Sequence, residues 1–300
     1  MHPSAYPTSE VRAMRRFGLF IVCFTALVVL GVTLPHSRRY VRAAAAQQSG
    51  NWHNGDCDDN SNHWGEAHVC QMRRTTFALP SGHLAVSTTN GGIDVTGEDR
   101  SDVALEARVT AWAPSESEAN DLLNQIVIDT NDGDLRDHGP HVHFFNRTGY
   151  SVDYHLHVPQ HLAANFHTMN GGIDLTRLNG NVHFETTNGG VTIDRLAGEV
   201  QGHTVNGGLN ISLDGDHWQG DGLHADTTNG GIDLRLPEHY SAHLETGTVN
   251  GGINVNFPIT IQGEIKNRLN TDLGSGGSTI HVQTVNGGVT ISHSDSATTD

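Results

Sequence analysis

Histidine is the residue type with the most chemical potential in this sequence, with 21 copies among 300 residues. Segments 141–143 (His-Val-His) and 155–157 (His-Leu-His) each place two imidazoles on one face of a strand, because side chains two residues apart point to the same side. Such a pair is typical of a surface metal site, and His161 and His167 follow shortly after. The spacing offers no carboxylate partner. We therefore expect no metal ligands here, and instead solvated histidines that gain charge below about pH 6.5.

Acidic residues follow glycine pairs in Gly-Gly-Ile-Asp segments that end at Asp94, Asp174 and Asp233. Glycine-rich calcium repeats need Gly-Gly-x-Gly-x-Asp, so that carbonyls and carboxylates of adjacent turns enclose Ca²⁺. This sequence lacks the second half of that motif. We expect solvated aspartates that bind divalent cations weakly at most.

Clustered acids of the kind used by glycan-cleaving enzymes are not apparent, because Asp94 and Asp174 lie far apart in the chain. No nucleophile elbow, phosphate loop or dinucleotide fingerprint stands in a supporting context. We therefore expect no catalytic residues, no cofactor and no enzymatic activity.

Cys57 and Cys70 close a short polar loop, and the only other cysteine is Cys23. In an oxidising compartment such a pair forms a disulfide by default. A zinc site that adds His63 and His68 is the alternative, although the spacing matches no common zinc pattern, and free thiols are a third possibility. We expect the disulfide.

The N-terminal segment indicates export. Residues 17–34 carry no charge, and three arginines stand on each side of them. The length fits a spanning helix, which needs about 17–25 residues. It also resembles a secretory signal with a cleavage site near Ala46. We expect an inner-membrane anchor facing the periplasm or the extracellular side, with secretion after cleavage as the alternative.

Charge separates the exported part from the N-terminus. The chain has 17 basic and 33 acidic side chains, and residues 1–46 hold six of the basic ones and one of the acidic ones. The remainder therefore carries 11 basic and 32 acidic side chains, a net charge of −21. Nucleic-acid binding needs clustered Lys and Arg, and this chain has one lysine, Lys266. We exclude nucleic acid as a partner.

A repeated turn indicates the fold. The triplet Asn-Gly-Gly occurs seven times, at intervals of 80, 18, 18, 23, 21 and 36 residues, and a threonine always stands two positions before the asparagine. The residues three and five positions after it are always aliphatic, which is the period of a half-buried strand. The seven asparagines are Asn90, Asn170, Asn188, Asn206, Asn229, Asn250 and Asn286.

Two arrangements are compatible with these turns. Asn-Gly favours positive φ and tight hairpins, but hairpins do not need the same residues in every copy. Stacked coils do, because equivalent residues then lie above one another and share one aliphatic core. We expect an all-β fold, a parallel β-solenoid (β-helix-like) with one short helical insertion and an N-terminal hydrophobic helix.

The domain boundaries follow from these patterns. We expect a signal or anchor at 1–46, a polar tether at 47–75, the solenoid at 76–293 and a disordered tail at 294–300. Residues 98–158 interrupt the repeat as a strand-helix-strand insertion, whose helix begins at the capping box formed by Ser115 and Glu118 and runs to about residue 126.

With its Val-Pro and Leu-Pro starts, its Thr-x-Asn-Gly-Gly repeats and this insertion, the chain resembles the bacterial adhesin-like family of unknown function over roughly residues 70–293. The resemblance implies an exported or membrane-tethered β-solenoid and supplies no catalytic residues.

We expect an interaction or structural module of the cell envelope. Its coils would present rows of Thr, Asn and Asp to an envelope protein or a polysaccharide. A membrane-anchored sensor of envelope stress is the alternative, followed by a carbohydrate-active solenoid enzyme. A repetitive surface by itself does not decide among them.

Overall fold

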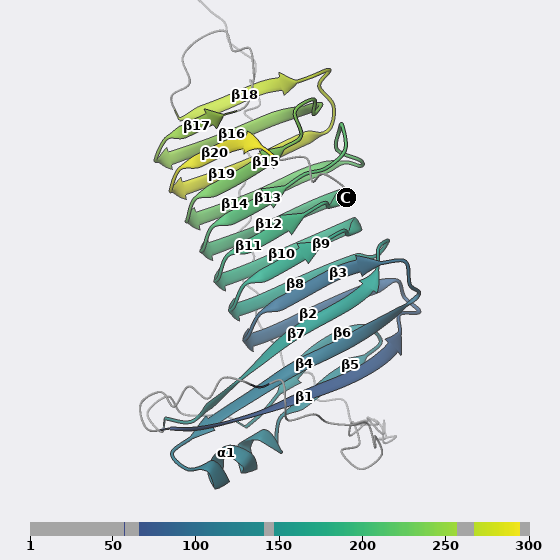
Figure 1. Ribbon diagram of the computed structural model, residues 1–300, viewed down its shortest axis with the longest axis vertical. Helices are drawn as coiled ribbons and strands as arrows, with labels where there is room; N and C mark the ends of the chain where they lie inside the picture. Colours follow the sequence, from purple (N-terminus) through teal and green to yellow (C-terminus); the bar gives the residue numbers. More distant parts are fainter. Residues whose placement is uncertain (1–56, 58–65, 141–146, 257–266, 295–300) are drawn as a thin grey trace, which may run out of the picture. The chain divides into compact units, whose positions relative to one another are not determined.

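The computed structural model describes residues 57, 66–140, 147–256 and 267–294 of the protein. These residues are mostly β-strand, and α1 (Glu116–Leu123) is the only helix among them. In the described part of the chain, no helix has the length and apolarity needed to cross a membrane. The expected anchor at 17–34 lies outside the described residues. The strands form two ten-stranded sheets (Figure 1).

We name these the first and the second sheet and give their strands in spatial order. The first sheet consists of β1 (Ala67–Ala78), β4 (Asp102–Ala113), β7 (Gly149–Pro159), β3 (Ile93–Glu98), β9 (Ile173–Thr176), β11 (Val191–Asp194), β13 (Leu209–Ser212), β15 (Ile232–Leu236), β20 (Val289–His293) and β17 (Ile253–Asn256). The second sheet consists of β18 (Arg268–Leu273), β16 (Ala242–Asn250), β19 (Thr279–Asn286), β14 (Gly222–Asn229), β12 (Ala197–Asn206), β10 (Asn179–Asn188), β8 (Ala163–Asn170), β2 (His83–Asn90), β6 (Asp134–His138) and β5 (Val127–Asn131).

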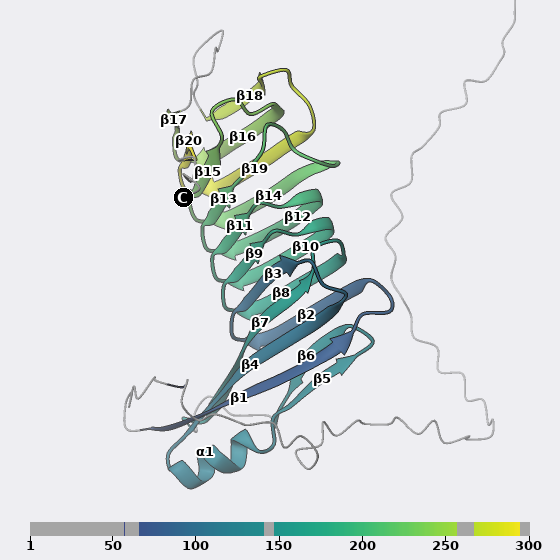
Figure 2. The same cartoon turned by 45° about the vertical axis from the view of Figure 1, so that its right-hand side comes forward.

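Each Asn-Gly-Gly triplet joins a strand of the second sheet to a strand of the first, and we call such a pair of strands a coil (Figure 2). Equivalent residues of neighbouring coils are register partners in parallel strands. Val182 pairs with Val200 in the second sheet, for example, and Ile193 pairs with Ile211 in the first. The expected stacking is thus present, and the described chain is an all-β, solenoid-like fold.

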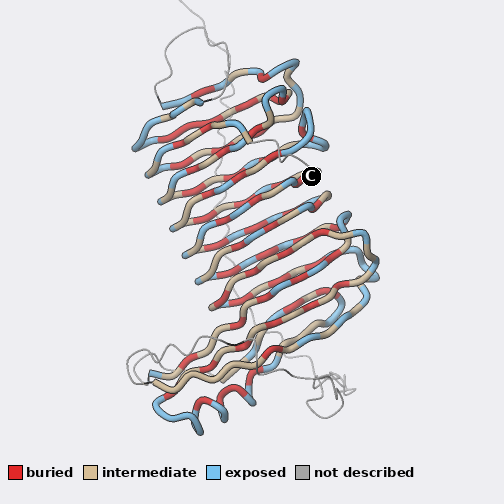
Figure 3. The backbone as a smooth tube through the Cα atoms, in the orientation of Figure 1, coloured by how far each residue is buried: buried red, intermediate tan, exposed pale blue. Residues whose placement is uncertain are grey.

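A single apolar core, mostly aliphatic, fills the space between the sheets. Buried and exposed residues alternate along the strands of both sheets, as Figure 3 shows. Side chains from the second sheet, such as Val182 and Phe184, and from the first, such as Ile193, belong to one contiguous cluster. This is the pattern that the period-2 alternation predicted.

The first glycine of the triplet is required by close stacking of the backbone. A Cβ atom on Gly207, the first glycine of its triplet, would overlap the carbonyl oxygen of Gly189 in the neighbouring coil. Of the seven triplets, only Gly91 has a φ in the left-handed region, and no asparagine of these turns does. The expectation that positive φ selects Asn-Gly is therefore wrong, since the backbones approach too closely for any side chain.

The spatial order of the coils departs from the chain order at the C-terminal end. The last coil in the chain, β19–β20, lies between β14–β15 and β16–β17 in both sheets. The coil β16–β17 is thus outermost, and β18 pairs with β16 in antiparallel orientation at the edge of the second sheet. The last interval of 36 residues reflects this detour.

The insertion begins at β4, and its strands extend both sheets with mixed orientation. Strand β4 pairs with β1 and β7 in antiparallel orientation, whereas β7 pairs with β3 in parallel. Because β1 begins at Ala67, residues 67–75 of the expected tether belong to the first sheet. The chain then returns to place β9 beside β3, so Asp94 and Asp174 are register partners. Their separation in the chain thus does not keep them apart in space.

Helix α1 begins at the predicted capping box. The Ser115 hydroxyl accepts a hydrogen bond from the Glu118 amide and donates one to its carboxylate. Arg73 of β1 donates to the carbonyl oxygens of Leu123 and Ile126 at the other end. Helix termini leave carbonyl groups without intrahelical partners, so these bonds fasten α1 to the first sheet.

Candidate functional site

The seven repeat asparagines form an unbroken row of amide hydrogen bonds. Each Nδ2 donates to the Oδ1 of the next asparagine over 2.8–2.9 Å, in the spatial order Asn250, Asn286, Asn229, Asn206, Asn188, Asn170, Asn90. The repeat threonines are buried, and six of them donate to a glycine carbonyl of the adjacent coil, as Thr204 does to Gly189. The expectation that these threonines face a partner is therefore wrong.

The outer surface of the second sheet carries one histidine on each of seven neighbouring strands. These side chains alternate with core residues, so all seven point away from the core. We call this surface the histidine face; its histidines are His83, His167, His183, His203, His224, His281 and His243, on β2, β8, β10, β12, β14, β19 and β16.

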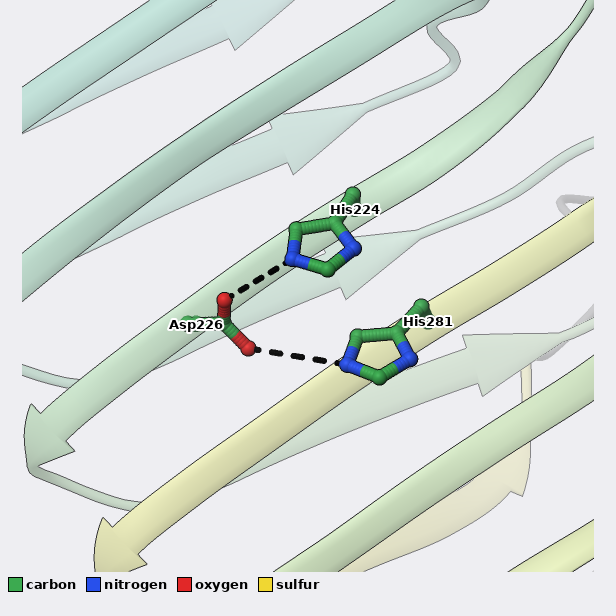
Figure 4. A group of neighbouring side chains, drawn as sticks. All are labelled: His224, Asp226 and His281. Atoms are coloured by element: carbon green, nitrogen blue, oxygen red, sulfur yellow. Dashed lines mark hydrogen bonds and ion pairs between the residues drawn. The ribbon is translucent and has the colours of Figure 1, made fainter. Parts of the chain in front are cut away.

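Three of these histidines join three carboxylates in a continuous chain. The ring nitrogens of His224 and His281 lie 3.0 and 3.8 Å from the two oxygens of Asp226 (Figure 4). The other ring nitrogen of His281 lies 3.1 Å from Glu245. His243 continues the chain, 3.4 Å from the second oxygen of Glu245 and 2.7 Å from Asp272. Imidazole and carboxylate alternate throughout.

The rings of His224 and His281 are stacked, with centroids 4.3 Å apart and planes inclined by 5°. The hydrogen bond from His281 lowers the pKa of the Glu245 carboxyl below its usual range, and His243 contributes. The hydrogen bond to Asp272 raises the pKa of the His243 imidazole, and Glu245 adds to this effect. His243 thus bridges two carboxylates most strongly when it is protonated.

The first sheet has histidine–carboxylate pairs that the sequence did not reveal. His155 lies 3.3 Å from Asp94, and His157 lies 2.8 Å from Glu98. The two imidazoles share one face as expected, and their carboxylate partners, which the spacing did not indicate, come from β3. His167 lies in β8 of the second sheet rather than beside them. His141 and His143 lie outside the described residues.

A disulfide joins Cys57 to Cys70, with 5.8 Å between the Cα atoms. Both sulfurs are therefore used, and the zinc alternative has no thiolates there. His68 instead stacks on Trp112, with ring centroids 6.0 Å apart.

The C-terminal histidine–carboxylate chain is the cluster that sequence reasoning missed. His224, His281 and Glu245 each stand five positions before a repeat asparagine, so alignment of the repeats would have placed them in one outward row. If the coils followed the order of the chain, Glu245 would be the neighbour of His224. In the structure His281 lies between these two residues.

Comparisons with solved structures find similarity at low identity. A candidate cell adhesion protein from Clostridium sporogenes ATCC 15579 is 13% identical, with 74% of this chain and 100% of that chain covered and a TM-score of 0.38. A candidate adhesin from Bacteroides fragilis NCTC 9343 is 11% identical, with coverages of 74% and 97% and a TM-score of 0.33. A candidate adhesin from Parabacteroides distasonis ATCC 8503 is 11% identical, with coverages of 73% and 96% and a TM-score of 0.31.

A comparison with curated proteins finds no match. The family model described as Toastrack DUF4097, a domain of unknown function, matches residues 32–292. This match agrees with the resemblance carried by the Thr-x-Asn-Gly-Gly repeats and covers most of the 300 residues. The chain therefore belongs to the Toastrack DUF4097 family.

Proposed function

We propose that this protein is an exported, non-enzymatic interaction module of the cell envelope, and that it recognises its partner with the histidine face. The observation that carries the proposal is the exact register of the stacked coils in the second sheet. Equivalent outward residues recur on successive strands, which lie about 4.8 Å apart in a β-sheet. A fixed, repetitive row of side chains suits recognition of an extended partner.

Exposed apolar side chains beside the histidines support the same role. The residue directly before the repeat asparagine points outward, and three such side chains are large, apolar and exposed. Val249 (66%) and Val285 (40%) lie on the neighbouring strands β16 and β19, and Met169 (47%) lies on β8. Adjacent apolar side chains rimmed by polar ones are typical of interaction surfaces. Internal amide bonds occupy the asparagine row next to them, so the histidines and these apolar side chains remain for a partner.

The partner class follows from charge. Residues 47–300 carry a net charge of −21 with histidines neutral, which disfavours anionic polymers above about pH 6.5. We propose an uncharged polysaccharide or an envelope protein as partner. An N-terminal anchor at 17–34 would hold the domain at the membrane, facing the periplasm or the extracellular side.

Retention of the full chain on envelope fractions tests this role. The face variant Met169→Ser/Val249→Ser/Val285→Ser should lose most retention on polysaccharide or envelope protein. The matched control Thr192→Ser/Asn210→Ser/Asn254→Ser changes three outward residues of the first sheet and should retain it. Equal retention by the two variants would remove the histidine face from the proposal.

Retention on envelope fractions also distinguishes the two alternative functions, a sensor of envelope stress and a carbohydrate-active enzyme. Capture of one defined regulatory protein of the inner membrane, in place of a polysaccharide or a structural envelope protein, would favour the sensor of envelope stress. Turnover of a glycan by the purified chain would favour an enzyme instead. Either result would overturn the adhesin-like role.

A further inference from the structure

We propose that His224, Asp226 and His281 form a binding site for one divalent transition-metal ion of the zinc class. Within the described residues, these form the only group of three or more His, Cys, Asp or Glu side chains whose ligand atoms all lie within 4.8 Å of one another. The site goes beyond the proposed recognition role and does not depend on it.

The fold brings the three residues together across two strands. His224 and His281 are register partners in the parallel strands β14 and β19. Asp226 lies two residues after His224, and therefore on the same side of β14. The site exists because the coil β19–β20 lies against β14–β15, which places residue 281 beside residue 224.

The three ligand atoms lie close together. The Nε2 atoms of both histidines face the Asp226 carboxylate, at 3.0 Å from Oδ2 and 3.8 Å from Oδ1 (Figure 4). Bonds of about 2.0–2.2 Å to a tetrahedral ion bring ligand atoms to roughly 3.4 Å from one another. Binding therefore requires the two stacked rings to rotate out of their parallel arrangement so that both Nε2 atoms point at one ion, which then takes the place of the protons between imidazole and carboxylate.

Glu245 supplies the support that metal-binding histidines commonly have. It lies 3.1 Å from Nδ1 of His281, so that an Nδ1–H donates to the carboxylate and the lone pair of Nε2 is left for an ion. A carboxylate in this position orients the imidazole ring and raises its basicity. His243 contacts the other oxygen of Glu245 and is itself paired with Asp272 of β18.

The chemistry of these ligands selects the class of ion. Imidazole nitrogen suits Zn²⁺, Cu²⁺ and Ni²⁺, whereas Ca²⁺ and Mg²⁺ prefer oxygen ligands throughout. The side chains of His224 and Asp226 are exposed by 55% and 34%, so an ion can enter from solvent and retain a water ligand. The pairs His155–Asp94 and His157–Glu98 on the first sheet each have one histidine and one carboxylate, and serve as natural controls.

Titration of the full chain with Zn²⁺ tests the site, after treatment with EDTA and with the disulfide kept oxidised. Calorimetry should show one tight ion per chain, and Co²⁺ should give the visible absorption of a site with nitrogen and oxygen ligands. His281→Gln and Asp226→Asn should each lower the affinity for this tightly bound ion, the tight step of the titration, by about 100-fold or more. Glu245→Gln should weaken it by about 10- to 100-fold, as expected for a positioning residue.

The control His155→Gln removes a paired surface histidine from the first sheet and should leave the tight step unchanged. A thermal melt of each variant without metal shows whether it is folded. Loss of the tight step in folded His281→Gln but not in His155→Gln would establish the site. A tight step that survives in His281→Gln, or that is equally weak in all variants, would overturn it, and neither result would affect the retention test of the histidine face.

Discussion

The middle coils and the C-terminal coils are built from the same repeat but stacked by different rules. From β8–β9 to β14–β15, neighbours in the chain are neighbours in space. Beyond β15 the chain passes over one position, forms the outermost coil and its antiparallel edge strand, and returns to fill the gap with β19–β20. The repeat thus fixes how one coil fits another, but it does not fix which coil comes next.

The difference has a functional consequence. In the middle of the second sheet, residues close in the chain make the outer surface, and its histidines make few contacts with carboxylates of adjacent strands. At the C-terminal end, strands from distant segments alternate, and the chain from His224 to Asp272 links four strands through imidazole–carboxylate contacts. The out-of-order coil therefore creates the densest cluster of titratable groups on this face.

The largest expected effect comes from a charge in the shared core. Ile193 is fully buried in a middle coil, and Ile193→Asp should unfold the protein, because an unpaired buried charge costs well over about 4 kcal/mol. Val255 holds the same repeat position in the outermost coil and is half-buried, so Val255→Asp should lower the melting temperature less. The exposed control Asp174→Asn should change the free energy of unfolding by no more than about 0.5 kcal/mol. Equal melts of all three would contradict the assignment of inward and outward residues.

Glycine substitutions probe backbone packing at the two glycine positions of the triplet. In Gly207→Ala, at the first position, the new methyl group overlaps the carbonyl oxygen of Gly189, so we expect a loss of more than about 2 kcal/mol. Gly251, the first glycine of the outermost triplet, is equally close to Gly287, but the second glycine there, Gly252, has open space where a Cβ would stand. Gly252→Ala should change the free energy of unfolding by no more than about 1 kcal/mol. Chemical denaturation measures both, and a severe loss in Gly252→Ala would show that another coil covers it.

The asparagine row gives a finer test of the coil order. Asn286 donates to Asn229 and accepts from Asn250, whereas Asn250 only donates, to Asn286. Asn286→Ala should therefore cost about twice as much as Asn250→Ala, with each lost bond contributing about 1 kcal/mol or less. If the coils followed chain order, Asn250 would be the interior member. A larger loss in Asn250→Ala would therefore favour chain order.

The smallest expected effect is a pH dependence at the outermost edge. The pKa of His243 is raised in the folded protein by Asp272 and Glu245. The stabilisation that His243 gives to the folded protein is therefore complete below the pKa of about 6.5 that it has in the unfolded chain. This stabilisation is lost as the pH rises through the higher pKa of the folded state. Hydrogen exchange of β18 amides should accelerate over that interval, while β12 amides stay protected. His243→Gln should remove the dependence; an unchanged profile in this variant would assign it to other histidines.

Much of the coil was predictable from local pattern. The aliphatic positions after each asparagine identified Ile193 and Ile211 as core residues, and the Ser115 capping box identified the start of α1. The role of the repeat glycines was not predictable from turn propensities. It arises from the approach of Gly207 to Gly189 in the next coil, a contact that exists only after stacking.

The candidate metal site shows where the pattern stops being informative. Local spacing singled out the pairs 141–143 and 155–157, and alignment of the repeats would have added only that residues 224, 245 and 281 share one outward row. His224 and His281 are 57 residues apart, as their numbers show, and become neighbours only through parallel pairing. Likewise Asp94 meets His155 and Asp174 only because the insertion returns to the same sheet.

The sequence by itself determined the coil: its period, its inward and outward faces, and the rows of threonine, asparagine and glycine that every copy repeats. Only the tertiary structure decided the order of the coils and thus which outward side chains meet. The physical reason is that the coils are nearly equivalent at their stacking surfaces, with the same register and the same aliphatic core. Any coil can therefore follow any other, and the connections between coils together with the antiparallel edge formed by β18 select the arrangement.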